Sequence, residues 1–165
     1  MNILFEDRHF LISEKPARIA VGSDASQDET FLEQIRDYYL RERTRLGKPG
    51  KGYCVPIHFL DRPVSGVMVF ATSSKAAQRI NEQFRDRQVT KRYIAVVEGS
   101  PKKDHGVLVN YLAKNTKLNK VWVSKKSDVK AKYCELSYQV IQKNAKYSLL
   151  HVHPKTGRSH QISKK

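Results

Sequence analysis

The sequence predicts an α+β fold, in which a mixed, mostly antiparallel β-sheet is flanked by two or more helices. Three observations support this prediction. Short apolar runs that alternate with polar residues recur along the chain and indicate strands. The segment 30–46 combines a helix-start signal with helical spacing of its apolar residues. The segment 66–71 is a continuous apolar run, typical of a buried central strand.

Two short strands are expected near the start of the chain, within residues 3–5 and 10–12. The second should end at Pro16, because proline has no N–H to donate to a sheet. Residues 20–29 are small and polar and indicate a loop. Thr30 and Glu33 then match a capping box, which predicts a helix over 30–46.

The rest of the chain predicts one further helix and a series of strands. Ser73 or Ser74 can cap the helix, whose inward face would hold Ala76, Ala77, Ile80 and Phe84. The expected strands cover 93–98, 106–112, 119–124, 130–142 and 146–153. The length suggests a single domain over 1–165.

The charge balance indicates a polyanionic partner. Lysine and arginine number 31 against 16 acidic residues, a formal net charge of +15, which fits nucleic acid or an anionic membrane surface. The segment 114–132 holds seven lysines and a single acid, Asp128. Trp122 lies among those lysines and favours RNA or DNA as the partner.

Targeting features are not evident in the sequence. No apolar run approaches the roughly 20 residues that span a bilayer, and the first residues do not resemble a signal peptide. Cys54 and Cys134 lack the spacing of a disulfide framework. They indicate reduced thiols and a cytoplasmic protein without a membrane partner.

The first candidate for chemistry is Asp61, in the loop 57–66 between two core segments. Such a loop can hold a carboxylate rigidly in a cleft; the alternative is a turn aspartate that accepts backbone amides. Arg62 precedes Pro63 and is biased toward extended backbone. Gly66 permits an unusual turn just before the apolar strand.

Two further candidates follow along the chain. Tyr93 begins a strand and either belongs to the core or stacks on a base. Thr156 and Gly157 indicate a tight turn, and Arg158 just beyond it is either solvated or binds phosphate. Histidines at 151, 153 and 160, with either cysteine, do not match a zinc pattern, so no metal is predicted.

Taken together and in this order, the motifs resemble the RluA-like family of RNA pseudouridine synthases. The family has an H-R-L-D-x-x-T/S-G loop, a K-x-Y-x-A strand and a T-G-R-x-H-Q-L/I-R strand. The matching segments here are His58–Gly66, Lys91–Ala95 and Thr156–Ile162. The opening, with its Glu14-Lys15-Pro16, is also similar to the family's start, so the resemblance spans almost the whole chain.

The resemblance implies an enzyme that isomerises uridine to pseudouridine in tRNA or rRNA, without a cofactor and as a monomer. The uracil is detached from C1′ through N1, rotated and rejoined through C5. Asp61 would be the catalytic carboxylate, either as a nucleophile or as the base that removes the ribose 2′ proton. Tyr93 would pack on the target uracil and Ile162 would line its pocket. Arg158 and Arg62 would bind substrate.

Two departures from the family pattern affect these expectations. Phe59 replaces the arginine of H-R-L-D, so it can wedge or stack but cannot pair with phosphate. Ser163 stands where the family has an arginine that pairs with the catalytic aspartate, and Lys164 would lie one strand position away, on the other face. Family members also continue past this point. We therefore expect a C-terminally truncated domain with tritium release near background; the alternative is a non-catalytic basic RNA-binding module.

Overall fold

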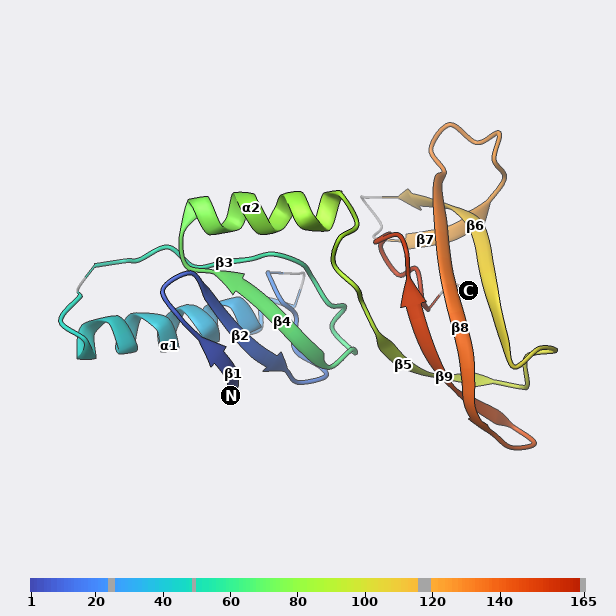
Figure 1. Cartoon of the computed structure of the whole chain (residues 1–165), viewed down its shortest axis with the longest axis horizontal. Helices are drawn as coiled ribbons and strands as arrows, with labels where there is room; N and C mark the ends of the chain where they lie inside the picture. Colours follow the sequence, from blue (N-terminus) through green and yellow to red (C-terminus); the bar gives the residue numbers. More distant parts are fainter. Residues whose placement is uncertain (24–25, 49, 116–119, 164–165) are drawn as a thin grey trace. The chain divides into compact units, whose positions relative to one another are not determined.

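The computed structural model describes residues 1–23, 26–48, 50–115 and 120–163. The chain divides into two compact units, Met1–Asp86 and Arg87–Lys165, and each contains one antiparallel sheet (Figure 1). The predicted α+β class with antiparallel pairing is confirmed. The strands form two sheets, whereas the sequence suggested one. The expectation of a single domain stays a prediction.

The first unit contains a four-stranded sheet and two helices. Its strands are β1 (Asn2–Glu6), β2 (Phe10–Lys15), β3 (Val55–Pro56) and β4 (Gly66–Ala71), and its helices are α1 (Phe31–Arg45) and α2 (Ser74–Arg85). The order across the sheet is β1-β2-β4-β3. β2 pairs with β4 along its whole length and ends at Lys15, directly before Pro16, as predicted.

Helix α1 begins at the predicted capping box. The Thr30 hydroxyl accepts from the Glu33 amide at 3.2 Å, and the Glu33 carboxylate accepts from the Thr30 amide at 2.7 Å. Phe31 and Ile35 have no exposed surface. The Phe31 ring lies 5.9 Å from the ring of Phe70, so α1 packs against β4.

Helix α2 is capped by Ser73, whose hydroxyl accepts from the Ala76 amide at 3.2 Å. Ala76 and Ala77 are buried against Ala71. Neighbouring residues of a strand point to opposite faces, so α1, on Phe70, and α2, on Ala71, cover opposite faces of the sheet. The flanking helices are therefore as predicted. None of the helices in the described part of the chain is long and apolar enough to cross a membrane.

The second unit is a five-stranded sheet in the order β5-β9-β8-β6-β7. The strands are β5 (Tyr93–Glu98), β6 (His105–Asn115), β7 (Lys120–Ser124), β8 (Lys132–Lys143) and β9 (Tyr147–Pro154). One face holds two buried clusters, formed by Leu112, Val121 and Cys134 and by Leu136, Leu150 and Val152. Side chains on the opposite face are more exposed, as at Val96 and Val107 (68% and 61%). Each predicted strand in this region is present. The boundaries differ from the predicted ones by at most two residues, except that β6 runs three residues further, to Asn115. The predicted strand start at residue 119 lies outside the described residues.

Candidate active site around Asp61

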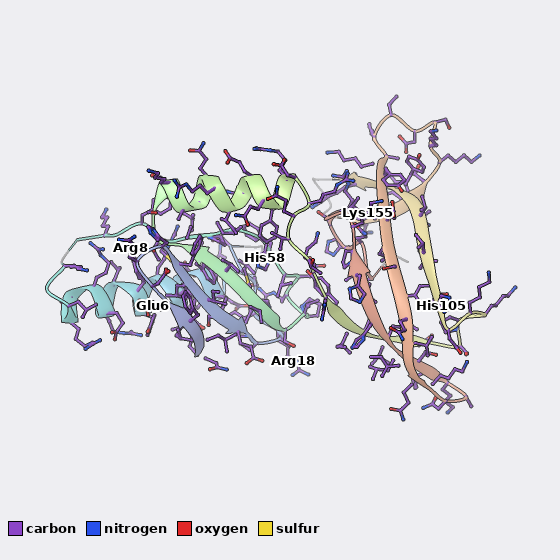
Figure 2. The ribbon with its side chains drawn as sticks, in the orientation of Figure 1. Glu6, Arg8, Arg18, His58, His105 and Lys155 are labelled. Carbon is purple, nitrogen blue, oxygen red and sulfur yellow. The ribbon has the colours of Figure 1, made fainter. Side chains whose placement is uncertain are left out.

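The loop that carries Asp61 connects β3 to β4 and is anchored by its neighbours. His58 (Figure 2) accepts from the Val69 amide at 3.3 Å and stacks on Phe84 of α2, with ring centroids 5.5 Å apart. Leu60 is buried, and the Val64 amide donates to the Asp61 carbonyl at 2.9 Å. Asp61 itself is half-buried. The loop therefore presents its carboxylate from a backbone that is fixed on both sides.

Gly66 ends this loop at the first position of β4. Its φ is 149°, inside the region that side chains disfavour, so the chain enters the strand in a conformation that glycine adopts without strain. This confirms the predicted unusual turn before the buried strand.

Lys15 is the neighbour of Asp61 that the sequence analysis missed. The side chain has no exposed surface, and its Nζ donates to the carbonyls of Pro16 and Ile19 at 2.9 and 2.8 Å and to that of Arg62 at 3.4 Å. Burial lowers the pKa of the Lys15 ammonium, and the nearby Asp61 carboxylate opposes that shift. Strand alternation was the available signal, because it places Lys15 on the inward face with buried Ser13 and Leu11.

Arg62 is held by contacts within the first unit. Its Nη1 forms an ion pair with Asp28 at 2.9 Å, and its Nη2 donates to the Ser26 hydroxyl at 2.5 Å. Its carbonyl accepts from the Arg18 amide at 2.7 Å. The structure thus ties Arg62 to the segment 26–28, and its predicted role as a substrate-binding residue stays a prediction.

Phe59, which replaces the arginine of the family loop, is 67% exposed. An aromatic ring of that exposure next to Leu60 and Asp61 contributes little to the core. Its position fits the wedge or stacking role that the sequence suggested, which stays a prediction.

In the second unit, Tyr93 and Ile162 pack against the same buried cluster of Leu136, Leu150 and Val152. The structure therefore brings these two predicted residues to one face of the second sheet. Tyr93 is only partly buried, which is compatible both with packing in the core and with contact to a base.

The segment Thr156–Ile162 corrects one expectation. The family motif suggested a strand here, but β9 ends at Pro154 and the residues that follow form turns, with a positive φ at His160. The cause is the buried Gln161 side chain. Its Oε1 accepts from the Thr156 hydroxyl at 2.7 Å and from the Arg158 amide at 3.1 Å, and its Nε2 donates to the Glu135 carbonyl at 3.0 Å.

Arg158 projects from this turn and is exposed. Its Nε donates to the Tyr133 carbonyl of β8 at 3.0 Å, which orients the guanidinium. Ser163 is exposed. Lys164, which was expected one position away and on the other face, lies outside the described residues.

Metal ligands do not gather in the described part of the chain: no group of three or more histidine, cysteine or acidic side chains there could hold an ion. The rings of His151 and His153 lie edge to face at 6.4 Å. Both cysteines are buried free thiols.

The chain thus combines an antiparallel α+β fold, an anchored loop carboxylate and a strongly basic composition. The sequence pattern of the RNA pseudouridylate synthases matches residues 9–164, so this chain belongs to that family.

Individual relatives agree with the family assignment. The chain is 32% identical over 161 residues to the ribosomal large subunit pseudouridine synthase C of Buchnera aphidicola subsp. Baizongia pistaciae, covering 97% of this chain and 48% of that protein. It is 30% identical to the tRNA pseudouridine synthase C of Vibrio parahaemolyticus, covering 98% and 66%. Among solved structures, human RNA pseudouridylate synthase domain containing 4 superposes with a TM-score of 0.76 at 25% identity, covering 98% of this chain and 61% of that one. The chain spans about half the length of the first of these relatives.

Proposed function

We propose that this chain acts on RNA as a pseudouridine synthase and isomerises uridine in ribosomal RNA or tRNA, with Asp61 as the catalytic carboxylate. Family membership supports the reaction, and the names of the relatives support the two classes of RNA. The observation on which the assignment of Asp61 rests is the anchored loop. A catalytic group must be held close to its productive geometry, and His58, Leu60 and Lys15 fix the backbone around it.

In this proposal Asp61 acts on the ribose of the target nucleotide. It either attacks C1′ as the uracil leaves or removes the 2′ proton. The target base must first leave its stack to reach the carboxylate. Phe59 would take the space that the base vacates, because its exposed ring can wedge between bases.

The other predicted residues would contact the substrate. Tyr93 would stack on the target uracil and Ile162 would line its pocket, while Arg158 and Arg62 would bind phosphate. The isomerisation is redox-neutral, so we propose that it needs neither a cofactor nor a metal. We also propose that the chain acts as a monomer.

The test is release of tritium from RNA that contains 5-tritiated uridine, with ribosomal RNA and tRNA as separate substrates. Release by the natural chain is expected to be slow, so the variants are also compared in the Ser163→Arg background, where we expect Asp61→Asn to reduce release to background and Asp37→Asn, on the exposed surface of α1, to leave it unchanged. Release that persists in Asp61→Asn would overturn the assignment of the carboxylate. An absence of release from any RNA, together with tight RNA binding, would favour a non-catalytic RNA-binding module.

Ser163 provides a second test. The family pattern has arginine at this position, so slow release by the natural chain and faster release by Ser163→Arg are expected. A charge-assisted hydrogen bond is worth about 1.5–3 kcal/mol, which corresponds to roughly 10- to 150-fold in rate. Ser163→Gln adds length without charge and should have little effect.

A further inference from the structure

Three aromatic side chains lie on one face of the second sheet, at the same end. Tyr111 of β6 pairs directly with Tyr133 of β8, and Trp122 of β7 pairs with Ala113, two residues along β6 from Tyr111. Directly paired residues, and residues two apart along a strand, point to the same face. Tyr111, Trp122 and Tyr133 therefore form a cluster across three adjacent strands, here called the aromatic patch.

The aromatic patch is accessible and partly ordered by its own contacts. Trp122 is 43% exposed and Tyr133 is 36% exposed. The rings of Tyr111 and Tyr133 lie edge to face with centroids 5.9 Å apart. The Tyr133 hydroxyl donates to Glu135, whose other oxygen pairs with Lys155 at 3.1 Å. Glu135 therefore engages the hydroxyl of Tyr133 while the residue remains exposed.

Positive charge borders the aromatic patch. Lys120 is two residues from Trp122 on β7 and points to the same face, and Lys125, Lys126 and Lys130 are exposed in the connection from β7 to β8. Lys114 and Lys132 pair with Val121 and Leu112 and point to the opposite face. The acid in the connection, Asp128, accepts from the Ser124 hydroxyl at 2.6 Å and from the Lys130 amide at 2.9 Å. Lys155 lies at the same end of the sheet, and His105 lies nearer the opposite end (Figure 2).

We propose that the aromatic patch is an additional RNA-binding site, which stacks unpaired bases on Trp122 and Tyr133 while the surrounding lysines bind the phosphates. Exposed aromatic rings on a sheet surface bind bases without regard to sequence, and a positively charged surround attracts the backbone. An acidic polypeptide would use the lysines but would gain little from the rings. The combination of exposed rings with cations therefore favours single-stranded RNA.

This RNA-binding site is separate from the proposed catalytic function, because Asp61 takes no part in it. It rests on the proposed function only in that RNA is taken as the partner. It would bind nucleotides of the RNA other than the one that reacts. Such a site raises the affinity of the chain for unpaired segments of its substrate without specifying which uridine is modified.

Trp122 is the only tryptophan of the chain, so its fluorescence reports on this site directly. We expect an oligouridylate of about 10 nucleotides, enough to occupy a single-strand site, to quench that fluorescence to saturation. The affinity of the labelled oligonucleotide, measured by anisotropy, should fall by about 5- to 150-fold in Trp122→Ala, since one stacked base contributes about 1–3 kcal/mol. Trp122→Phe keeps a ring and should bind within a few-fold of wild type.

Matched controls separate stacking from charge and from folding. Val96→Ala changes an exposed side chain of β5 on the sheet face that carries the aromatic patch, and it should leave the affinity unchanged. The double variant Lys125→Gln, Lys126→Gln should lower the slope of log affinity against log salt by about 1.4, or about 0.7 per phosphate contact.

Three results would each overturn the proposal. The first is wild-type affinity in Trp122→Ala, and the second is equal quenching by a duplex of the same length. The third is equal quenching by polyglutamate, which would indicate a protein partner. Trp122-dependent binding without tritium release would contradict only the proposed enzyme activity, and release with Trp122-independent binding would contradict only this site.

Discussion

The Nζ atom of Lys15 lies 3.4 Å from the carbonyl oxygen of Arg62, the residue that follows Asp61. The same ammonium donates to the carbonyls of Pro16 and Ile19. One buried side chain thereby connects the end of β2, the segment after it and the candidate catalytic loop. Burying an ammonium is costly unless it is paired and hydrogen-bonded, and these carbonyl oxygens offset that cost.

Replacement of Lys15 by methionine tests this connection. Methionine has nearly the same length, so the change removes the charge and its hydrogen bonds. The carbonyls of Pro16 and Ile19 lose this donor, whereas the Arg62 carbonyl keeps the Arg18 amide. We expect the free energy of unfolding in urea to fall by about 1–3 kcal/mol.

Lys75→Met, on the exposed surface of α2, is the control and should be neutral. Unchanged stability in Lys15→Met would show that the buried ammonium does not contribute to the fold. In that case the free energy gained by the hydrogen bonds to Pro16 and Ile19 would be no larger than the cost of removing the ammonium from water.

Arg18 provides a second prediction, which concerns backbone strain. Its φ is 71°, and its amide donates to the Arg62 carbonyl at 2.7 Å. A side chain in this left-handed conformation costs about 1–2 kcal/mol, whereas glycine adopts it freely but loses about 0.5–1 kcal/mol more chain entropy on folding. We expect Arg18→Gly to stabilise the chain by a net amount of about 0.5–1 kcal/mol, measured as a rise in Tm.

Arg18→Ala separates strain from charge, because it removes the guanidinium and keeps the Cβ. It should leave the stability within about 0.5 kcal/mol of wild type. Equal stabilisation by alanine and glycine would assign the effect to the loss of a positive charge.

Local signals explain why much of the first unit could be predicted. The capping box of Thr30 and Glu33 lies within four residues and set the start of α1 correctly. Proline at position 16 set the end of β2, and the apolar run 66–71 identified β4. Each of these features depends on a few neighbours in sequence.

Features that depend on distant partners could not be predicted in the same way. The turn after β9 requires Gln161 to reach the carbonyl of Glu135, 26 residues earlier, and strand-like residues in a family motif do not show that contact. Lys15 was treated only as the end of a strand, because its acceptor at Arg62 lies 47 residues away. Division into two sheets likewise follows from long-range pairing.

Gln161 is the subject of the third prediction. It is 4% exposed and bonds to Thr156, Arg158 and Glu135. Gln161→Leu keeps the approximate volume and removes every one of these bonds, so we expect a loss of about 1–3 kcal/mol in the free energy of unfolding.

The activity of this variant should also fall, because Arg158 and Ile162 would lose their fixed positions. Gln139→Leu changes an exposed glutamine on β8 and should alter neither stability nor tritium release. Wild-type stability in Gln161→Leu would mean that the turn forms without the side-chain network.

The last prediction concerns Cys54, which directly precedes β3 and is 6% exposed. Burial raises the pKa of its thiol to about 11, and Arg36, whose Nε donates to the Cys54 carbonyl at 3.2 Å, opposes the shift only in part. At a pH of about 8, roughly 0.1% of such a thiol is thiolate, the reactive form. A disulfide reagent should therefore leave Cys54 of the native chain unmodified within an hour at that pH. Cys134 has no exposed surface and should also stay unmodified, whereas both cysteines should react in urea. The pKa of the Cys54 thiol is higher in the folded chain than in the unfolded chain. The thiol therefore contributes to the free energy of unfolding at pH values below its unfolded-state pKa, and this contribution is lost as the pH rises toward about 11. Cys54→Val cannot titrate, so its stability should fall less over this range than that of wild type. Rapid modification of one equivalent in the native chain, absent in Cys54→Val, would show that this segment opens readily.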